Sequence, residues 1–137
     1  MKILALDHGK KRVGVAISDA GRVHAFPLET VPGKDRHKLM SRLSEIVVEN
    51  EVDIVVVGLP LTMLGEVGHQ AEKVTDFARR LQHVLGESVA VELWDERLSS
   101  AQADRGRDRG SRRVVKDGMR DMMAAVVILQ SFLDRKR

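Results

Sequence analysis

A chain of 137 residues with no cysteine and a net charge of +3 is expected to form a single domain over residues 1–137. The lack of cysteine excludes disulfides, zinc–thiolate sites and thiol nucleophiles. No segment has the ~20 apolar residues of a membrane span, and the N-terminal apolar run is too short for a signal peptide. We therefore expect a cytoplasmic protein with no membrane partner.

The first part of the chain predicts a β-meander followed by a helix. Short apolar runs separated by turn residues predict three hairpin-linked strands, at residues 2–8, 12–18 and 22–28. The hydrophobic periodicity then changes to that of a helix, because apolar side chains from residue 39 to residue 47 follow helical spacing. Asp35 is a candidate N-cap for this helix.

The second part alternates strands with helices. A β-branched run at residues 54–57 is typical of a central parallel strand. An amphipathic helix is predicted over residues 71–85, ended by Gly86, and a fifth strand over residues 89–94. A final helix carries an apolar stripe from residue 122 to residue 133. This order predicts an α/β fold with a mixed sheet covered by helices.

The segment 105–118 differs in composition from both parts. It holds three glycines and mixed charges, and Val114 and Val115 are its apolar residues. We expect a mobile surface loop. Its basic side chains could close on a polyanion; the alternative is a solvated charge run, since acids such as Asp108 dilute the positive charge.

Three carboxylates stand where a predicted strand ends or a helix begins: Asp7, Glu96 and Asp121. A lone charge at the edge of an apolar segment is costly to desolvate. Acids that converge there from distant parts of a chain suit Mg²⁺, which prefers hard oxygen ligands. Each acid also has a simpler interpretation. Asp7 could satisfy the backbone of the following turn, Glu96 could pair with Arg97, and Asp121 could be favoured by the dipole at a helix start.

Four sequence motifs stand in order along the chain. They are LALDxGxKRxGVA from Leu4, VVGLPL from Val56, DERLSS from Asp95 and DxxAAxxILQ from Asp121. Together they resemble the YqgF/RuvX family of the RNase H-like superfamily, whose members are described as nucleases that process the 5′ end of pre-16S ribosomal RNA and as Holliday-junction resolvases. Ser99 and Ser100 stand where the family commonly has two threonines.

This resemblance implies an RNase H-like five-stranded sheet with three antiparallel and two parallel strands. It implies Asp7, Glu96 and Asp121 as catalytic acids that ligate one or two Mg²⁺ or Mn²⁺ ions. The expected activity is metal-dependent hydrolysis of phosphodiester bonds. Structured RNA and ribosomal precursor particles are the expected partners, with branched DNA as the alternative substrate. A ribosome-assembly factor that binds without cleaving is a third interpretation, and both a monomer and a homodimer fit the sequence.

Basic side chains near the acids are the candidate phosphate contacts. They are Lys11, Arg12, Arg97, Arg112, Arg113 and Lys116. Aromatic residues make up 3% of the chain and there is no tyrosine, so recognition of backbone and shape is favoured over base stacking. We interpret His8 as a loop residue that forms hydrogen bonds and takes no part in catalysis.

Overall fold

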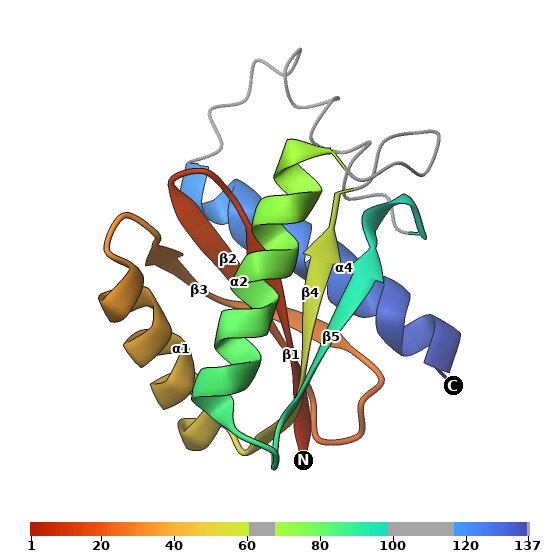
Figure 1. Ribbon diagram of the computed structural model, residues 1–137. Coiled ribbons are helices and arrows are strands. Elements are labelled where there is room, and N and C mark those ends of the chain that lie inside the picture. The colour runs from red at the N-terminus through yellow and green to blue at the C-terminus, as the bar shows by residue number, and fades with distance from the viewer. Residues whose placement is uncertain (61–67, 99–116, 137) are drawn as a thin grey trace.

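The computed structural model describes residues 1–60, 68–98 and 117–136, and they contain a mixed five-stranded sheet (Figure 1). Its strands are β1 (Lys2–His8), β2 (Arg12–Ser18), β3 (Ala25–Pro32), β4 (Val52–Leu59) and β5 (Ala90–Asp95). The spatial order is β3-β2-β1-β4-β5. β1, β2 and β3 are antiparallel, whereas β4 and β5 run parallel to β1. The predicted combination of three antiparallel and two parallel strands is confirmed.

Helices cover both faces of this sheet. α1 (Arg36–Glu49) and α2 (His69–Leu85) lie on one face, and α4 (Asp117–Lys136) crosses the other (Figure 1). A short 3-10 helix, η1 (Glu96–Leu98), follows β5. None of the helices in the described part of the chain combines the length and apolarity needed to cross a bilayer.

The alternation of side chains along each strand divides the core into two apolar layers. On the α1–α2 side, Leu4 and Leu6 of β1 pack with helix residues such as Leu43. On the α4 side, Ala5 of β1 packs with helix residues such as Ala125. Small residues on the second face let α4 approach the sheet closely.

Local signals set most element boundaries. The predicted N-cap Asp35 accepts a hydrogen bond from the backbone N–H of Lys38 at 3.2 Å and starts α1. α2 ends before Gly86, as predicted. The strand predicted at 22–28 is Ala25–Pro32.

That shift has a physical cause in the preceding turn. The Asp19 carboxylate accepts hydrogen bonds from the backbone N–H groups of Val23 and His24, which keeps both residues in the turn. β3 then continues to Pro32 because it is an edge strand, where proline is tolerated.

α4 begins earlier than the apolar stripe predicts. It starts at Asp117, and the hydroxyl of Thr30 in β3 donates to the carbonyl of Gly118 at 2.7 Å. Asp121 therefore lies about one turn inside the helix, and its interpretation as a helix-start acid is wrong. Residues 117–118 of the predicted loop are helical; residues 105–116 of that loop lie outside the described residues.

Gly14 of β2 is the point at which α4 comes closest to the sheet. A Cβ atom added at Gly14 would overlap the backbone carbonyl of Asp121. Because this neighbour is backbone, a side chain at position 14 could be accommodated only by moving the helix. The missing side chain therefore sets the distance between α4 and β2 at this end of the sheet.

Replacing Gly14 with alanine is expected to destabilise the fold by roughly 2 kcal/mol or more, since overpacking a rigid site costs about 1–3 kcal/mol. Urea unfolding followed by circular dichroism measures the loss. Gly21→Ala is the matched control, because the nearest atom to an added Cβ there is 3.9 Å away. Equal stability of the two variants would contradict the close approach of α4.

Candidate active site

Asp7 occupies the carboxyl end of the central strand β1. Its side chain is 3% exposed and points to the α4 face, because Ile3 and Ala5 on the same side of the strand belong to the α4-side core. The register pairs Asp7 with Gly14 of β2. On the other side, Leu6 pairs with Val57 of β4, which places Gly58 next to Asp7 across the sheet.

Glu96, the first residue of η1, reaches the same edge from β5. Its side chain is 1% exposed. A Cβ added at Gly58 would meet the Cδ1 atom of Ile128 in α4 and would lie 3.0 Å from Oε1 of Glu96, so these two side chains occupy space that a side chain on β4 would otherwise fill. Burial, with a smaller contribution from the charge of Asp95, raises the pKa of Glu96 to about 7.

Asp121 of α4 reaches the same edge over β2, on the other side of Asp7 from Glu96. Its backbone lies against Gly14, the cross-strand partner of Asp7. Its Oδ2 atom accepts a hydrogen bond from Nε of Arg12 at 2.8 Å, and the two side chains are 22% and 32% exposed. Asp121 is therefore ion-paired with a candidate phosphate contact.

The three predicted acids thus meet at one edge of the sheet, with Asp7 between two glycines. The donor set fits a divalent metal in kind, because Mg²⁺ and Mn²⁺ prefer carboxylate oxygens. In this conformation, however, residues 1–60, 68–98 and 117–136 contain no group of three or more His, Asp or Glu side chains placed to hold a single ion. Asp121 is instead engaged by Arg12.

The predicted phosphate contacts are distributed unevenly. Lys11 is exposed on the turn between β1 and β2. Arg97 pairs with Asp95 at 2.7 Å, and its hydrogen bonds lower the pKa of that acid. The other predicted contacts lie outside the described residues: Arg112, Arg113 and Lys116.

His8 lies on the opposite face of β1 from Asp7. Its ring packs on Phe77 of α2 with a centroid distance of 4.5 Å. Its Nδ1 atom is buried and forms no hydrogen bond with the described residues, so the predicted hydrogen-bonding role does not apply to this nitrogen. Burial is the main cause that lowers the pKa of His8.

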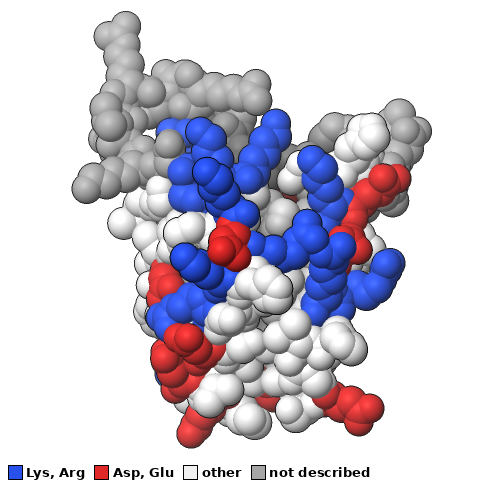
Figure 2. Space-filling view, turned by 60° about the vertical axis from the view of Figure 1, so that its left-hand side comes forward, with Lys and Arg blue, Asp and Glu red and all other residues white. Residues whose placement is uncertain are grey.

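The structure also brings together cations that the sequence analysis did not single out. Lys and Arg side chains form a band across the face that carries α1 and α2 (Figure 2). Lys34 and Arg36 come from the start of α1, and Lys73 and Arg80 from α2. Lys73 and Arg80 are seven residues apart, so they share one face of α2. That spacing was the available signal in the sequence.

Comparison with known proteins places the chain in a family. A sequence model described as "RuvX: Holliday junction resolvase" matches residues 1–135. The chain belongs to the RuvX family.

Relatives in this family resemble the chain over nearly its full length. A protein of Chloroflexus aurantiacus is 45% identical over 136 residues, covering 98% of this chain and 88% of its own. A Bacillus cereus protein is 45% identical over 143 residues, covering 99% and 100%. Both are named "Putative pre-16S rRNA nuclease".

Solved structures agree on the fold of this RuvX family member. Thermus thermophilus RuvC in complex with a Holliday junction substrate superposes with a TM-score of 0.61 and 14% identity, covering 99% of this chain and 96% of that one. The fowlpox virus Holliday junction resolvase gives a TM-score of 0.55 and 12% identity, with full coverage of both chains. The predicted RNase H-like fold class is confirmed.

The buried carboxylate of Glu96 predicts a pH-dependent change in stability. Its pKa is raised from 4.5 to about 7 on folding. The wild type therefore loses stability as pH rises through this window, by up to about 3 kcal/mol at ~1.4 kcal/mol per pH unit. In EDTA, Glu96→Gln should be more stable than wild type at pH 8 and nearly equal to it below pH 4.5.

Urea unfolding at the two pH values measures this difference. The exposed acid Glu87 provides the control, because Glu87→Gln removes one carboxylate without removing a buried one. A gain for Glu96→Gln that is independent of pH would show that burial of its charge is not the cause.

Proposed function

We propose that the protein is a metal-dependent nuclease, a hydrolase that cleaves phosphodiester bonds in structured RNA and acts on the 5′ end of pre-16S ribosomal RNA in ribosome biogenesis. The observation that carries this proposal is the position of Asp7 between Gly14 and Gly58. Those two glycines bring Asp121 and Glu96 to the same edge. The names of the relatives, which are up to 45% identical, support the choice of RNA.

The carboxylates of Asp7, Glu96 and Asp121 would hold the metal. A bound Mg²⁺ or Mn²⁺ ion would supply an activated water and stabilise the charge on the phosphate. The protein side chains themselves orient the carboxylates and exclude water from them. Asp7 and Glu96 are buried, so their carboxylates are oriented before substrate arrives. The absence of side chains at Gly14 and Gly58 leaves room for the backbone of α4 and for the Glu96 side chain.

Arg12 has a double role in this proposal. Its guanidinium holds Asp121 in the present conformation, and Arg12 follows Lys11 in sequence as the first residue of β2. When a phosphate binds at the edge, Arg12 can donate to it, because arginine forms charge-assisted hydrogen bonds with phosphate oxygens. The Asp121 carboxylate would then be available as a metal ligand.

A second candidate is resolution of four-way DNA junctions, favoured by the description of the matching family model. The chemistry of the carboxylates would be the same for both substrates. A ribosome-assembly factor that binds pre-16S RNA without cleaving it is the remaining alternative. The substrate and the fate of the scissile bond distinguish the three.

Replacing Asp7 with asparagine is expected to reduce cleavage at least 100-fold, since even changes to residues around metal ligands cost about 10–100-fold. The assay offers a precursor small-subunit ribosomal RNA fragment and a synthetic four-way DNA junction, each with Mg²⁺, Mn²⁺ or EDTA. Wild type should cut the RNA only with metal. The matched control is Asp53→Asn, at the opposite end of the sheet, where Asp53 pairs with Arg22 at 2.6 Å.

The outcomes separate the candidates. Metal-dependent cutting of the DNA junction alone would favour the resolvase. Salt-sensitive RNA binding without cutting of either substrate would contradict the nuclease and favour the assembly factor. If Asp7→Asn still cuts the substrate, the proposed role of these carboxylates in cleavage is wrong.

A further inference from the structure

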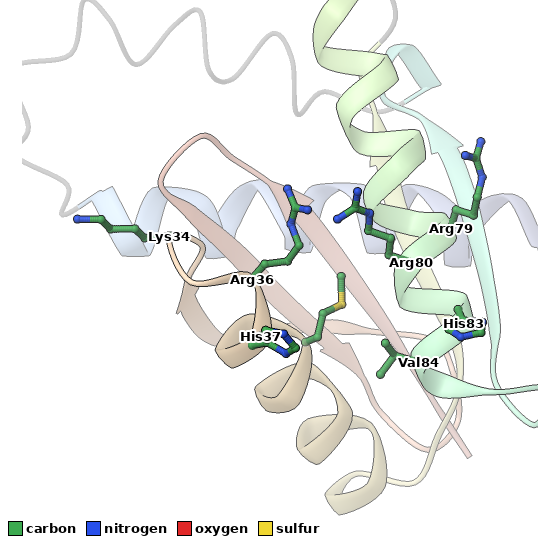
Figure 3. A pocket seen from close by; sticks show the side chains of 8 residues that line it. Lys34, Arg36, His37, Arg79, Arg80, His83 and Val84 are labelled. Carbon is green, nitrogen blue, oxygen red and sulfur yellow. The ribbon is translucent and has the colours of Figure 1, made fainter.

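A basic groove lies between α1 and α2, on the face of the sheet opposite the three acids. It has a volume of about 940 Å³ and is lined by Lys34, Arg36, Arg79 and Arg80 together with histidine and apolar side chains. Arg36 and Arg80 project from the two helices toward one another (Figure 3). Its lining contains no carboxylate among the described residues.

A second cavity continues the groove toward the acids. It has a volume of about 340 Å³ and shares Arg36 and Arg80 with the groove. It adds Lys73 and one carboxylate, Asp76, of α2, and extends to His8 and Gly9 at the end of β1. This end lies one residue beyond Asp7, about 3.3 Å along the strand. We call the two cavities together the α1–α2 groove.

Cations in the α1–α2 groove are available to a ligand. Within residues 1–60, 68–98 and 117–136, neither Arg36 nor Lys73 has an ion-pair partner, whereas Arg80 contacts Asp76 at 3.1 Å. The side chains of Arg80 and Asp76 are 46% and 50% exposed. An exposed pair of this kind contributes about 0–1 kcal/mol, so Arg80 can exchange it for a phosphate.

The dimensions suit a linear polyanion. Lys73 and Arg80 are separated by seven residues of α2, or about 10 Å along the helix axis. The charges on one strand of a duplex are spaced about 3.4 Å apart along its axis, so this length faces about three phosphates. The cations line a concave channel. A flat membrane surface would instead require cations on a protruding surface, so a nucleic-acid strand is the better fit.

The geometry points to the α1–α2 groove as a second nucleic-acid contact, which holds the phosphates of the strand that flanks the scissile bond. This inference rests on the proposed function for the position of that bond. The strand would cross the turn at Gly9 from the Asp7 face of β1 to its His8 face. The scissile bond would thus lie on one face of this sheet edge, and the flanking phosphates would be bound on the other face.

The test is binding of a fluorescein-labelled 40-nucleotide RNA hairpin and its DNA counterpart, followed by anisotropy in EDTA between 50 and 200 mM KCl. The groove variant is Arg36→Gln with Arg80→Gln. The control variant is Lys38→Gln with Arg135→Gln, two exposed positions outside the groove. Both variants remove two positive charges, so the comparison separates a specific contact from net charge.

We expect roughly tenfold weaker binding by the groove variant at 100 mM KCl. The slope of log K against log[KCl] should fall by about 1.4 to 1.8, which corresponds to two lost phosphate contacts. The control variant should stay within twofold of wild type. Equal losses on RNA and DNA would identify the phosphate backbone as the ligand.

Binding by the groove variant that equals binding by the control variant overturns the inference. Because EDTA prevents metal-dependent cleavage, the binding result does not depend on the proposed nuclease activity. If the groove variant loses binding while wild type cleaves nothing with metal, the groove stands and the nuclease proposal falls. If wild type cleaves RNA with metal while the groove variant binds normally, the nuclease proposal stands and the groove falls. Thermal unfolding of each variant confirms that it is folded.

Discussion

The close approach of α4 to β2 at Gly14 is the constraint on which the site depends. Backbone of the helix rests where a side chain would otherwise stand, and the strand residue paired with Gly14 is Asp7. Gly58 has a related role on β4, where the side chains of Ile128 and Glu96 fill the space. Two missing side chains therefore determine which functional groups can share one sheet edge, and the packing of α4 through small residues such as Ala125 maintains the spacing.

Alternation along β1 gives the two faces of the sheet different chemistry at the same end. Asp7 faces α4 and its neighbour His8 faces α2. The three acids gather on one face, and the cations of the α1–α2 groove gather on the other. Because consecutive strand residues point in opposite directions, a single sheet edge can carry carboxylates on one face and a basic groove on the other without mutual neutralisation.

Sequence patterns predicted those parts of the fold that depend on local signals. The strands of the first hairpin coincide with their predicted ranges, and Asp35 caps α1. The start of α4 was missed because its first turn shows no apolar periodicity in the sequence. That turn is held instead by the hydrogen bond from Thr30 to the carbonyl of Gly118. The pairing of Arg12 with Asp121 joins residues far apart in sequence. The α1–α2 groove likewise depends on how two helices pack: the spacing of Lys73 and Arg80 indicates a basic face on α2, but not that this face lies opposite the basic start of α1.

The edge strand β3 carries a further consequence. Phe26 and Leu28 are 49% and 37% exposed on it, and an apolar edge of this kind can template the addition of another strand. Pro27 and Pro32 lie in the same strand, and neither supplies a backbone N–H. Two of the donors that an incoming strand would need are therefore absent. The protein can therefore expose apolar side chains along β3 while this edge resists pairing with another strand.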